Sequence, residues 1–347
     1  MSIQPFVTPR PIIAAPMAGG PTTVRLATAV AEAGGFPFLA GGYKTAEALH
    51  QEIEQIRATG APFGVNIFTP GDQTVDTAAF TAYASELAPD AARHGVQLSR
   101  EPVADDDHWH EKIALLTTHP VPVVSFTFGL PPATDMAALR RAGTYVVITV
   151  TTPDEAHAAA EHGADGLIVQ GEAAGGHSAT FDPTRIPASV DLPTLITSIQ
   201  SITELPLIAA GGLDGATAVR AVLDAGAIAA AVGTLLLRTD EAGTSPVHRA
   251  ALAAPNFDHT VLTRAFTGRP ARALANDFIA QHDAHAPAAY PAVHHLTRSL
   301  RQAAAQAHDP HRVHLWAGTG YRNAPTGPAA DVIRTLYPLP TDQQLSR

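Results

Sequence analysis

Short apolar segments alternate with alanine-rich stretches of helical character through the first two thirds of this chain. Such alternation is typical of a parallel sheet whose strands are joined by helices. Most of these segments are apolar at nearly every position, which is the pattern of strands buried on both faces. The predicted strands are 11–17, 36–42, 63–68, 121–129, 144–150, 166–171, 206–212 and 227–234.

The stretches between these strands carry helix signals, and several of them end at glycine, as at Gly163 and Gly226. Eight strands with helical connections fit a closed (β/α)8 barrel, the TIM barrel, better than an open sheet. Glycines and polar residues gather at the C-terminal ends of the predicted strands, where such barrels build their active sites. The sequence therefore predicts an α/β fold with an active site at that end.

Two stretches exceed what a minimal barrel needs. Residues 69–120 contain two predicted helices around an acidic run at 105–107, which we interpret as a solvated loop. Residues 240–314 are helical in pattern and rich in histidine, which predicts a mainly helical cap domain over the barrel mouth. The expected organisation is a barrel at 1–239, the cap at 240–314 and a C-terminal segment at 315–347 that returns to the barrel.

Composition excludes several classes of protein. The 347 residues include no cysteine, so disulfides, thiolate nucleophiles, zinc–thiolate sites and iron–sulfur clusters are absent. The formal net charge of -10 argues against a nucleic-acid partner. No signal segment and no apolar run near the ~20 residues of a membrane span is visible. We expect a soluble, cytoplasmic protein with no membrane partner.

Two glycine-bearing loops follow the last two predicted strands. Gly211 and Gly212 lead into a helix, and Gly233 and Thr234 end the next strand. In barrels these two loops commonly bind phosphate, because glycine lets backbone N–H groups approach the oxygens and a helix N-terminus adds a favourable dipole. Tight turns without a ligand are the alternative interpretation.

A third segment, from Gln170 to His177, ends in two glycines and a histidine at the end of a predicted strand. Histidine suits proton abstraction because its ordinary pKa lies near neutrality. A plain loop histidine fits the spacing too. Asn66 and the loop from Ala15 to Gly20 add polar and backbone groups at the same end, and Asn66 fits a satisfied strand-end polar residue equally well.

Other residues carry weaker signals. Lys44 could add positive charge near an anionic substrate or be solvated, and Tyr43 and Trp316 could line a pocket or pack in the core. The histidines of 240–314 match no metal-binding spacing. We therefore expect no metal site.

Taken together, these segments resemble the FMN-dependent nitronate monooxygenases, formerly called 2-nitropropane dioxygenases, over nearly the whole chain. Their motifs occur here in the same order and at similar spacing. The matching segments are 11–23, 31–45, 63–68, 123–129, 163–177, 206–219, 227–234 and 315–320.

The resemblance implies FMN as cofactor and His177 as the catalytic base for neutral nitroalkanes. It implies oxidation of alkyl nitronates by O2 to a carbonyl compound and nitrite through a flavin semiquinone, with the nitronate and O2 as partners and a homodimer left open. The residues that fall on the family's FMN positions are Met17, Asn66, Gln170, Gly175, Gly176, Gly211, Gly212, Ala231, Val232, Gly233 and Thr234.

The chain departs from the family pattern beside His177, because the acidic residue is Glu172 and Ala173 stands at the usual Glu position. This departure puts in doubt whether a carboxylate orients His177 and so supports its strength as a base. The main alternative is an NAD(P)H-dependent flavin reductase of the enoyl-ACP reductase or quinone reductase type on the same barrel. A flavin-free barrel acting on a phosphorylated metabolite is a further alternative.

Overall fold

The computed structural model describes residues 5–71, 74–340 and 342, and its centre is a closed barrel of eight parallel strands. All eight predicted strands are confirmed, each somewhat shorter than its apolar segment. In their order around the barrel they are β1 (Ile12–Ala14), β2 (Phe36–Ala40), β3 (Gly64–Phe68), β4 (Val123–Thr127), β5 (Tyr145–Val150), β6 (Gly166–Gln170), β8 (Leu207–Ala210) and β9 (Ala229–Val232).

The barrel closes where β1 pairs with β9, with Ile12 opposite Ala230 and Ala14 opposite Val232. Side chains that point inward fill the lower barrel, and Phe36 and Phe38 contact each other edge to face there. Phe6 packs against both rings from the N-terminal segment. The interior is therefore a packed core below the strand ends rather than a pore.

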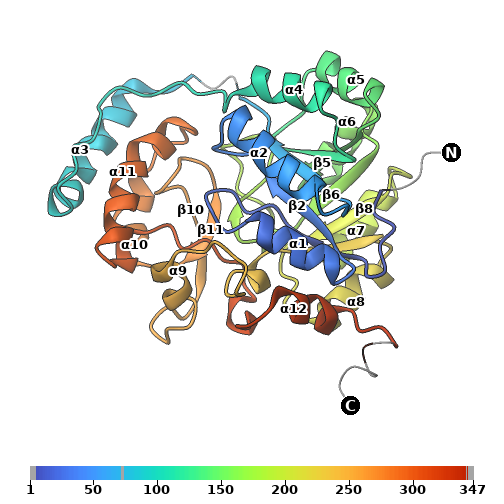
Figure 1. The fold of residues 1–347 in the computed structure, drawn as a ribbon. Helices are drawn as coiled ribbons and strands as arrows, with labels where there is room; N and C mark the ends of the chain where they lie inside the picture. The colour runs from blue at the N-terminus through green and yellow to red at the C-terminus, as the bar shows by residue number, and fades with distance from the viewer. Residues whose placement is uncertain (1–4, 72–73, 341, 343–347) are drawn as a thin grey trace.

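Helices cover the outside of the barrel in the expected places (Figure 1). Threonine side chains cap several of them: Thr23 accepts a hydrogen bond from the backbone N–H of Leu26, and Thr45 from that of Ala48. The covering helices are α1 (Val24–Glu32), α2 (Ala46–Arg57), α4 (Trp109–Thr118), α5 (Ala133–Arg141), α6 (Pro153–Glu161), α7 (Leu192–Gln200) and α8 (Ala216–Asp224).

The segment after residue 240 differs in part from the mainly helical expectation. It contains α9 (Pro246–Ala251), α10 (Asp277–His282) and α11 (Ala292–Gln306), but also the strands β10 (Thr260–Thr263) and β11 (Ala271–Leu274). These strands form a small antiparallel sheet with β7 (Gly176–His177). The two strands are only four residues long and lie between helical stretches, so their pattern gave no clear strand signal.

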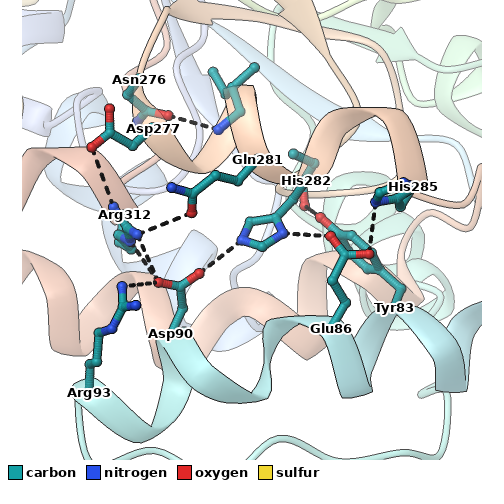
Figure 2. A network of polar contacts seen from close by, with 12 residues as sticks. Tyr83, Glu86, Asp90, Arg93, Asn276, Asp277, Gln281, His282, His285 and Arg312 are labelled. Atoms are coloured by element: carbon teal, nitrogen blue, oxygen red, sulfur yellow. Dashed lines mark hydrogen bonds and ion pairs between the residues drawn. The ribbon is translucent and has the colours of Figure 1, made fainter.

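Helix α3 (Thr77–Arg93), in the long connection between β3 and β4, packs against α11 rather than on the barrel. A network of polar contacts joins the two segments, as Figure 2 shows. His282 lies between two carboxylates of α3, with Nδ1 2.6 Å from Glu86 and Nε2 2.8 Å from Asp90. Arg312 also bonds Asp90, at 2.9 Å. His282 of the late segment thus pairs with two acids of α3.

Part of the C-terminal segment lies against the barrel. Helix α12 (Ala329–Leu336) packs on α1 and α8, and Arg10 donates to the carbonyl of Tyr337 at 2.9 Å and pairs with Asp342. Residues 341 and 343–347 of the expected C-terminal segment lie outside the described residues. None of the helices described is long and apolar enough to cross a membrane.

The short 3-10 helices are η1 (Thr234–Leu236), η2 (Asp283–His285), η3 (Pro310–Arg312) and η4 (Tyr321–Asn323).

Candidate active site

A cavity of about 620 Å³ opens at the C-terminal ends of the barrel strands, within the size range of small-molecule sites. The structure brings every predicted site residue to its lining. These residues are Met17, Asn66, Gln170, Gly175, Gly176, His177, Gly211, Gly212, Ala231, Val232, Gly233 and Thr234. They come from the ends of five barrel strands, β1, β3, β6, β8 and β9, which converge only because the sheet closes.

The loop after β8 is shaped so that only glycine fits well. Gly211 and Gly212 have φ of +101° and +71°, in the left-handed region. A Cβ at Gly211 would lie 2.8 Å from the carbonyl oxygen of Gly171, and one at Gly212 would lie 2.9 Å from Cβ of Ala173. The loop therefore presents bare backbone to the cavity. In the described part of the chain, the N–H groups of these two glycines have no acceptor.

The loop after β9 lies next to the C-terminal segment. The hydroxyl of Thr234 accepts a hydrogen bond from the backbone N–H of Gly318 at 2.9 Å. Gly175 approaches the same segment, because a Cβ there would lie 2.5 Å from the Gly318 nitrogen. The glycines after β6, β8 and β9 thus form one backbone-lined cradle with donors suited to an anion such as phosphate.

Two amide side chains, those of Asn66 on β3 and Gln170 on β6, add polar groups to the cavity lining. The Asn66 amide nitrogen donates to the hydroxyls of Ser125 and Thr127, each at 2.9 Å, which leaves its oxygen free to accept. Gln170 is fully engaged with the loop that follows it. Its oxygen accepts from the N–H of Ala179 at 2.8 Å, and its nitrogen donates to the carbonyl of His177 at 3.2 Å.

His177 is held at the cavity by the small sheet, since its backbone pairs with Ala271 of β11. Three aromatic rings surround its imidazole. The ring centroids of Phe128, Tyr290 and Trp316 lie 5.7, 5.5 and 5.5 Å from that of His177. This apolar surrounding disfavours a charged imidazole.

The electrostatics agree with an uncharged His177. Burial first, and then the positive charges of Arg269 and Arg301, lower the pKa of His177 to about 3. Its imidazole is therefore unprotonated at neutral pH and has a lone pair to accept a proton.

The two arginines were not predicted from the sequence. Arg301, on α11, lines the cavity and is 5% exposed, and its guanidinium donates to the hydroxyl of Thr297 and the carbonyl of His294. Arg269 lies over the ring of Phe128, with Cζ 4.0 Å from the centroid. Within the described residues, neither arginine forms an ion pair with a carboxylate. Buried cations without a carboxylate favour an anionic ligand.

The acidic run 105–107 is a correction to the sequence interpretation. Asp107 accepts a hydrogen bond from the backbone N–H of Tyr43 at 2.8 Å and pairs with buried Lys112 at 2.8 Å. Asp105 pairs with His295 of α11. The run is therefore structural rather than merely solvated. It holds Tyr43, which lines the cavity with Trp316, at a positive φ of 66°.

The charged side chains of Lys44 and Glu172, both considered in the sequence, have partners in the structure. Lys44 reaches the cavity lining, but its ammonium pairs with Glu52 at 2.6 Å, so its charge is already compensated. Glu172 pairs with Arg272 at 2.9 Å, and no hydrogen bond joins it to the His177 ring in the described part of the chain. A carboxylate therefore does not orient His177 here. No group of three or more His, Asp or Glu side chains suited to a metal occurs in the part described.

A TIM barrel with a glycine-lined loop cradle, a partly buried histidine and a buried arginine at the strand ends is typical of an enzyme that acts on small molecules. Comparison with known proteins identifies the family. The nitronate monooxygenase family model matches residues 3–338. The chain belongs to the nitronate monooxygenase family and is an enzyme of that class.

Individual relatives agree. The chain is 34% identical over 324 residues to a probable nitronate monooxygenase of Bacillus subtilis (92% of this chain, 93% of the relative), and 33% identical over 334 residues to one of Staphylococcus aureus (94% and 93%). Among solved structures it resembles a nitroalkane oxidase from Streptomyces ansochromogenes, with a TM-score of 0.92 and 46% identity over 98% of this chain and 99% of that one. FabK from Thermotoga maritima, at 23% identity and a TM-score of 0.74 over 99% and 96%, shows the same fold.

Proposed function

We propose that this enzyme holds FMN in the cavity and oxidises alkyl nitronates with O2, giving a carbonyl compound and nitrite. The phosphate would lie on the cradle formed by Gly211, Gly212, Gly233 and Thr234. That cradle supports the proposal because it combines bare backbone, free N–H groups and a helix, α8, that begins directly after it. Bound FMN would supply the electron transfer and the reaction with O2.

The substrate side of the cavity fits an anion. A nitronate carries its negative charge on the nitro oxygens. Buried Arg301 lines the cavity and would offer positive charge there, and Arg269, over the ring of Phe128, would add to the positive potential. Aromatic rings around His177 exclude water and strengthen these electrostatic interactions. We propose that the segment 240–314, which supplies Arg301 and Tyr290, is the cap that closes this side.

Neutral nitroalkanes need a base, and His177 is the residue that the geometry favours. Its imidazole would take the proton from the α-carbon while the electron pair of that C–H bond moves into the nitro group. A pKa of about 3 makes His177 a weak base by itself. Proton transfer would therefore depend on the positive charge of Arg301 in the cavity, which would stabilise the nitronate as it forms. The observation that carries this proposal is that His177 and buried Arg301 line the same cavity.

The test compares two substrates with one variant. His177→Ala should lose turnover of a neutral nitroalkane by about 100-fold or more, which is the usual contribution of a general base. It should retain most turnover of the preformed nitronate, because that substrate has already lost its proton. Equal losses with both substrates would contradict the assignment of His177 as the base.

A further inference from the structure

Among the residues that the structure describes, the ring of His177 has one side-chain hydrogen-bond partner, and it is neither a carboxylate nor a family motif residue named above. Nε2 lies 2.9 Å from the hydroxyl oxygen of Thr267, in the connection between β10 and β11. Thr267 is 1% exposed and lines the same cavity. No hydrogen bond to Nδ1 of His177 occurs within the described residues.

The position of the Thr267 hydroxyl is fixed by its surroundings. The backbone N–H groups of Thr267 and Gly268 both donate to the carbonyl of Arg264, at 3.1 and 2.8 Å. Gly268 has a φ of +78°, and a Cβ there would lie 2.9 Å from the backbone of Ala289. The turn is hydrogen-bonded and packs closely against Ala289, which holds Thr267 in place.

The same connection also holds the backbone that follows His177. The N–H of Ser178 donates to the carbonyl of Pro270 at 2.8 Å, and the Arg269 guanidinium donates to the carbonyls of Ser178 and Thr180. The connection between β10 and β11 therefore holds both the ring of His177 and the backbone that follows it. A displacement of the Thr267 side chain would therefore also displace the imidazole ring.

Proton accounting decides which ring nitrogen carries the hydrogen. The Thr267 hydroxyl has a single hydrogen, and its oxygen lies 3.3 Å from the buried carbonyl of Arg269, which has no other donor among the residues described. An unsatisfied buried carbonyl costs about 1–3 kcal/mol. The hydroxyl therefore donates to Arg269, and its lone pair accepts from Nε2–H of His177.

We propose that Thr267 is a positioning residue that fixes His177 as the Nε2–H tautomer, so that Nδ1 is the atom that accepts the α-proton. This inference rests on the proposed role of His177 as a base. The α-proton would pass to Nδ1 to give an imidazolium, whose Nε2–H stays bonded to Thr267. The Thr267 hydroxyl thus orients the His177 ring. Glu172 does not, because its carboxylate pairs with Arg272.

The direct test is a long-range 1H–15N correlation spectrum of the holoenzyme with 15N-labelled histidine. Signals of His177 are assigned from their loss in His177→Gln. We expect Nδ1, the nitrogen that couples mainly to Hε1, at the shift of an unprotonated nitrogen and Nε2 at that of a protonated one. The opposite pattern in the wild-type enzyme would overturn the inference whatever the activity.

Variants separate positioning from folding. Thr267→Val should mix the two tautomers and lower kcat/KM for a neutral nitroalkane by on the order of 10-fold more than for the nitronate, a part of the general-base contribution. Thr267→Ser should restore both readouts. Thr180→Val is the matched control, because the Thr180 hydroxyl is equally buried and has no partner in the part described. An unchanged tautomer in Thr267→Val would refute the role of Thr267.

The two proposals fail differently. If His177→Ala lowers turnover of both substrates equally, the base assignment fails, but the tautomer measurement still stands. If the tautomer is Nδ1–H while His177→Ala is selective for the neutral substrate, the base remains and the inference about Thr267 and Nδ1 is wrong.

Discussion

The ring of Tyr43 lies flat against the ring of His294, with centroids 4.2 Å apart and planes 5° from parallel. Tyr43 follows β2 of the barrel, whereas His294 belongs to α11 in the late segment. Burial first, and then Arg301, lowers the pKa of His294 well below its ordinary value, so an uncharged ring stacks on Tyr43. The stack joins the barrel to α11 where both line the cavity.

Removal of this ring should loosen the closed side of the cavity. We expect Tyr43→Ala to raise KM for small nitronates by about 10-fold, because a lost aromatic contact and its buried area cost over 1 kcal/mol. Tyr43→Phe keeps the stack and loses only the 3.3 Å hydrogen bond to the Tyr290 hydroxyl, so its KM should stay within about threefold. Similar KM values for the two variants would contradict the role of the stack. Steady-state kinetics with a series of nitronates makes this measurement.

If the glycine cradle binds the FMN phosphate, the addition of a single Cβ atom to it should weaken flavin binding. Gly212→Ala would place a Cβ against Ala173 in a left-handed conformation that costs about 1–2 kcal/mol, so FMN affinity should fall about 10-fold or more. Gly215→Ala is the control, since a Cβ there meets nothing within 4 Å. Flavin absorbance relative to protein, and FMN titration of the apoprotein, report the change. Full flavin retention in Gly212→Ala would refute the phosphate cradle.

The charge of Arg301 should affect both binding and pH dependence. Arg301→Gln removes a hydrogen-bonding cation, and we expect kcat/KM for nitronates to fall about 10- to 100-fold. The exposed Arg298, one turn earlier on α11, also lines the cavity, and Arg298→Gln should have a smaller effect because solvent screens it. Equal effects would show that the buried position of Arg301 is unimportant.

The pH profile follows from the same charges. The pKa of His177 is about 3, so in the wild-type enzyme no protonation of His177 should limit kcat/KM for neutral nitroalkanes between about pH 5 and 8. Arg301 lowers that pKa, and its removal should raise it toward the ordinary value. The acid limb of the Arg301→Gln profile should therefore move to higher pH, and a shift to lower pH would contradict the assigned sign.

The contact between α3 and the late segment should contribute to stability. Burial alone would raise the pKa of Asp90, but hydrogen bonds from His282 and Arg312 outweigh it, and the pKa lies below its ordinary value. This stabilisation is present above the unfolded-state pKa of about 3.9 and is lost as pH falls through the folded-state pKa.

Asp90→Asn removes the buried carboxylate that His282 and Arg312 share, and we expect the free energy of unfolding to fall by about 3 kcal/mol. The control is Asp331→Asn, whose carboxylate is 65% exposed and pairs with Arg334, and which should change stability by less than about 0.5 kcal/mol. Denaturant unfolding at neutral pH gives both values. A neutral effect of Asp90→Asn would show that the network adds little.

Much of the barrel could be predicted because its strands are buried on both faces and read as continuous apolar runs, and the glycines at their ends mark the cradle. Thr267 and Arg301 could not be found in this way. They lie 90 and 124 residues after His177, and only the pairing of β7 with β11 and the packing of α11 bring them to its ring and cavity. A short strand and a polar residue on an amphipathic helix leave no local signal.

The most direct test of the whole account is anaerobic mixing of the purified protein with propionate 3-nitronate and, separately, with NADH and NADPH, followed by visible flavin absorbance. We predict a yellow protein whose flavin is reduced by the nitronate and is left oxidised by both nucleotides. Rapid bleaching by a nucleotide with an inert nitronate would contradict the account and assign the protein to the flavin reductases.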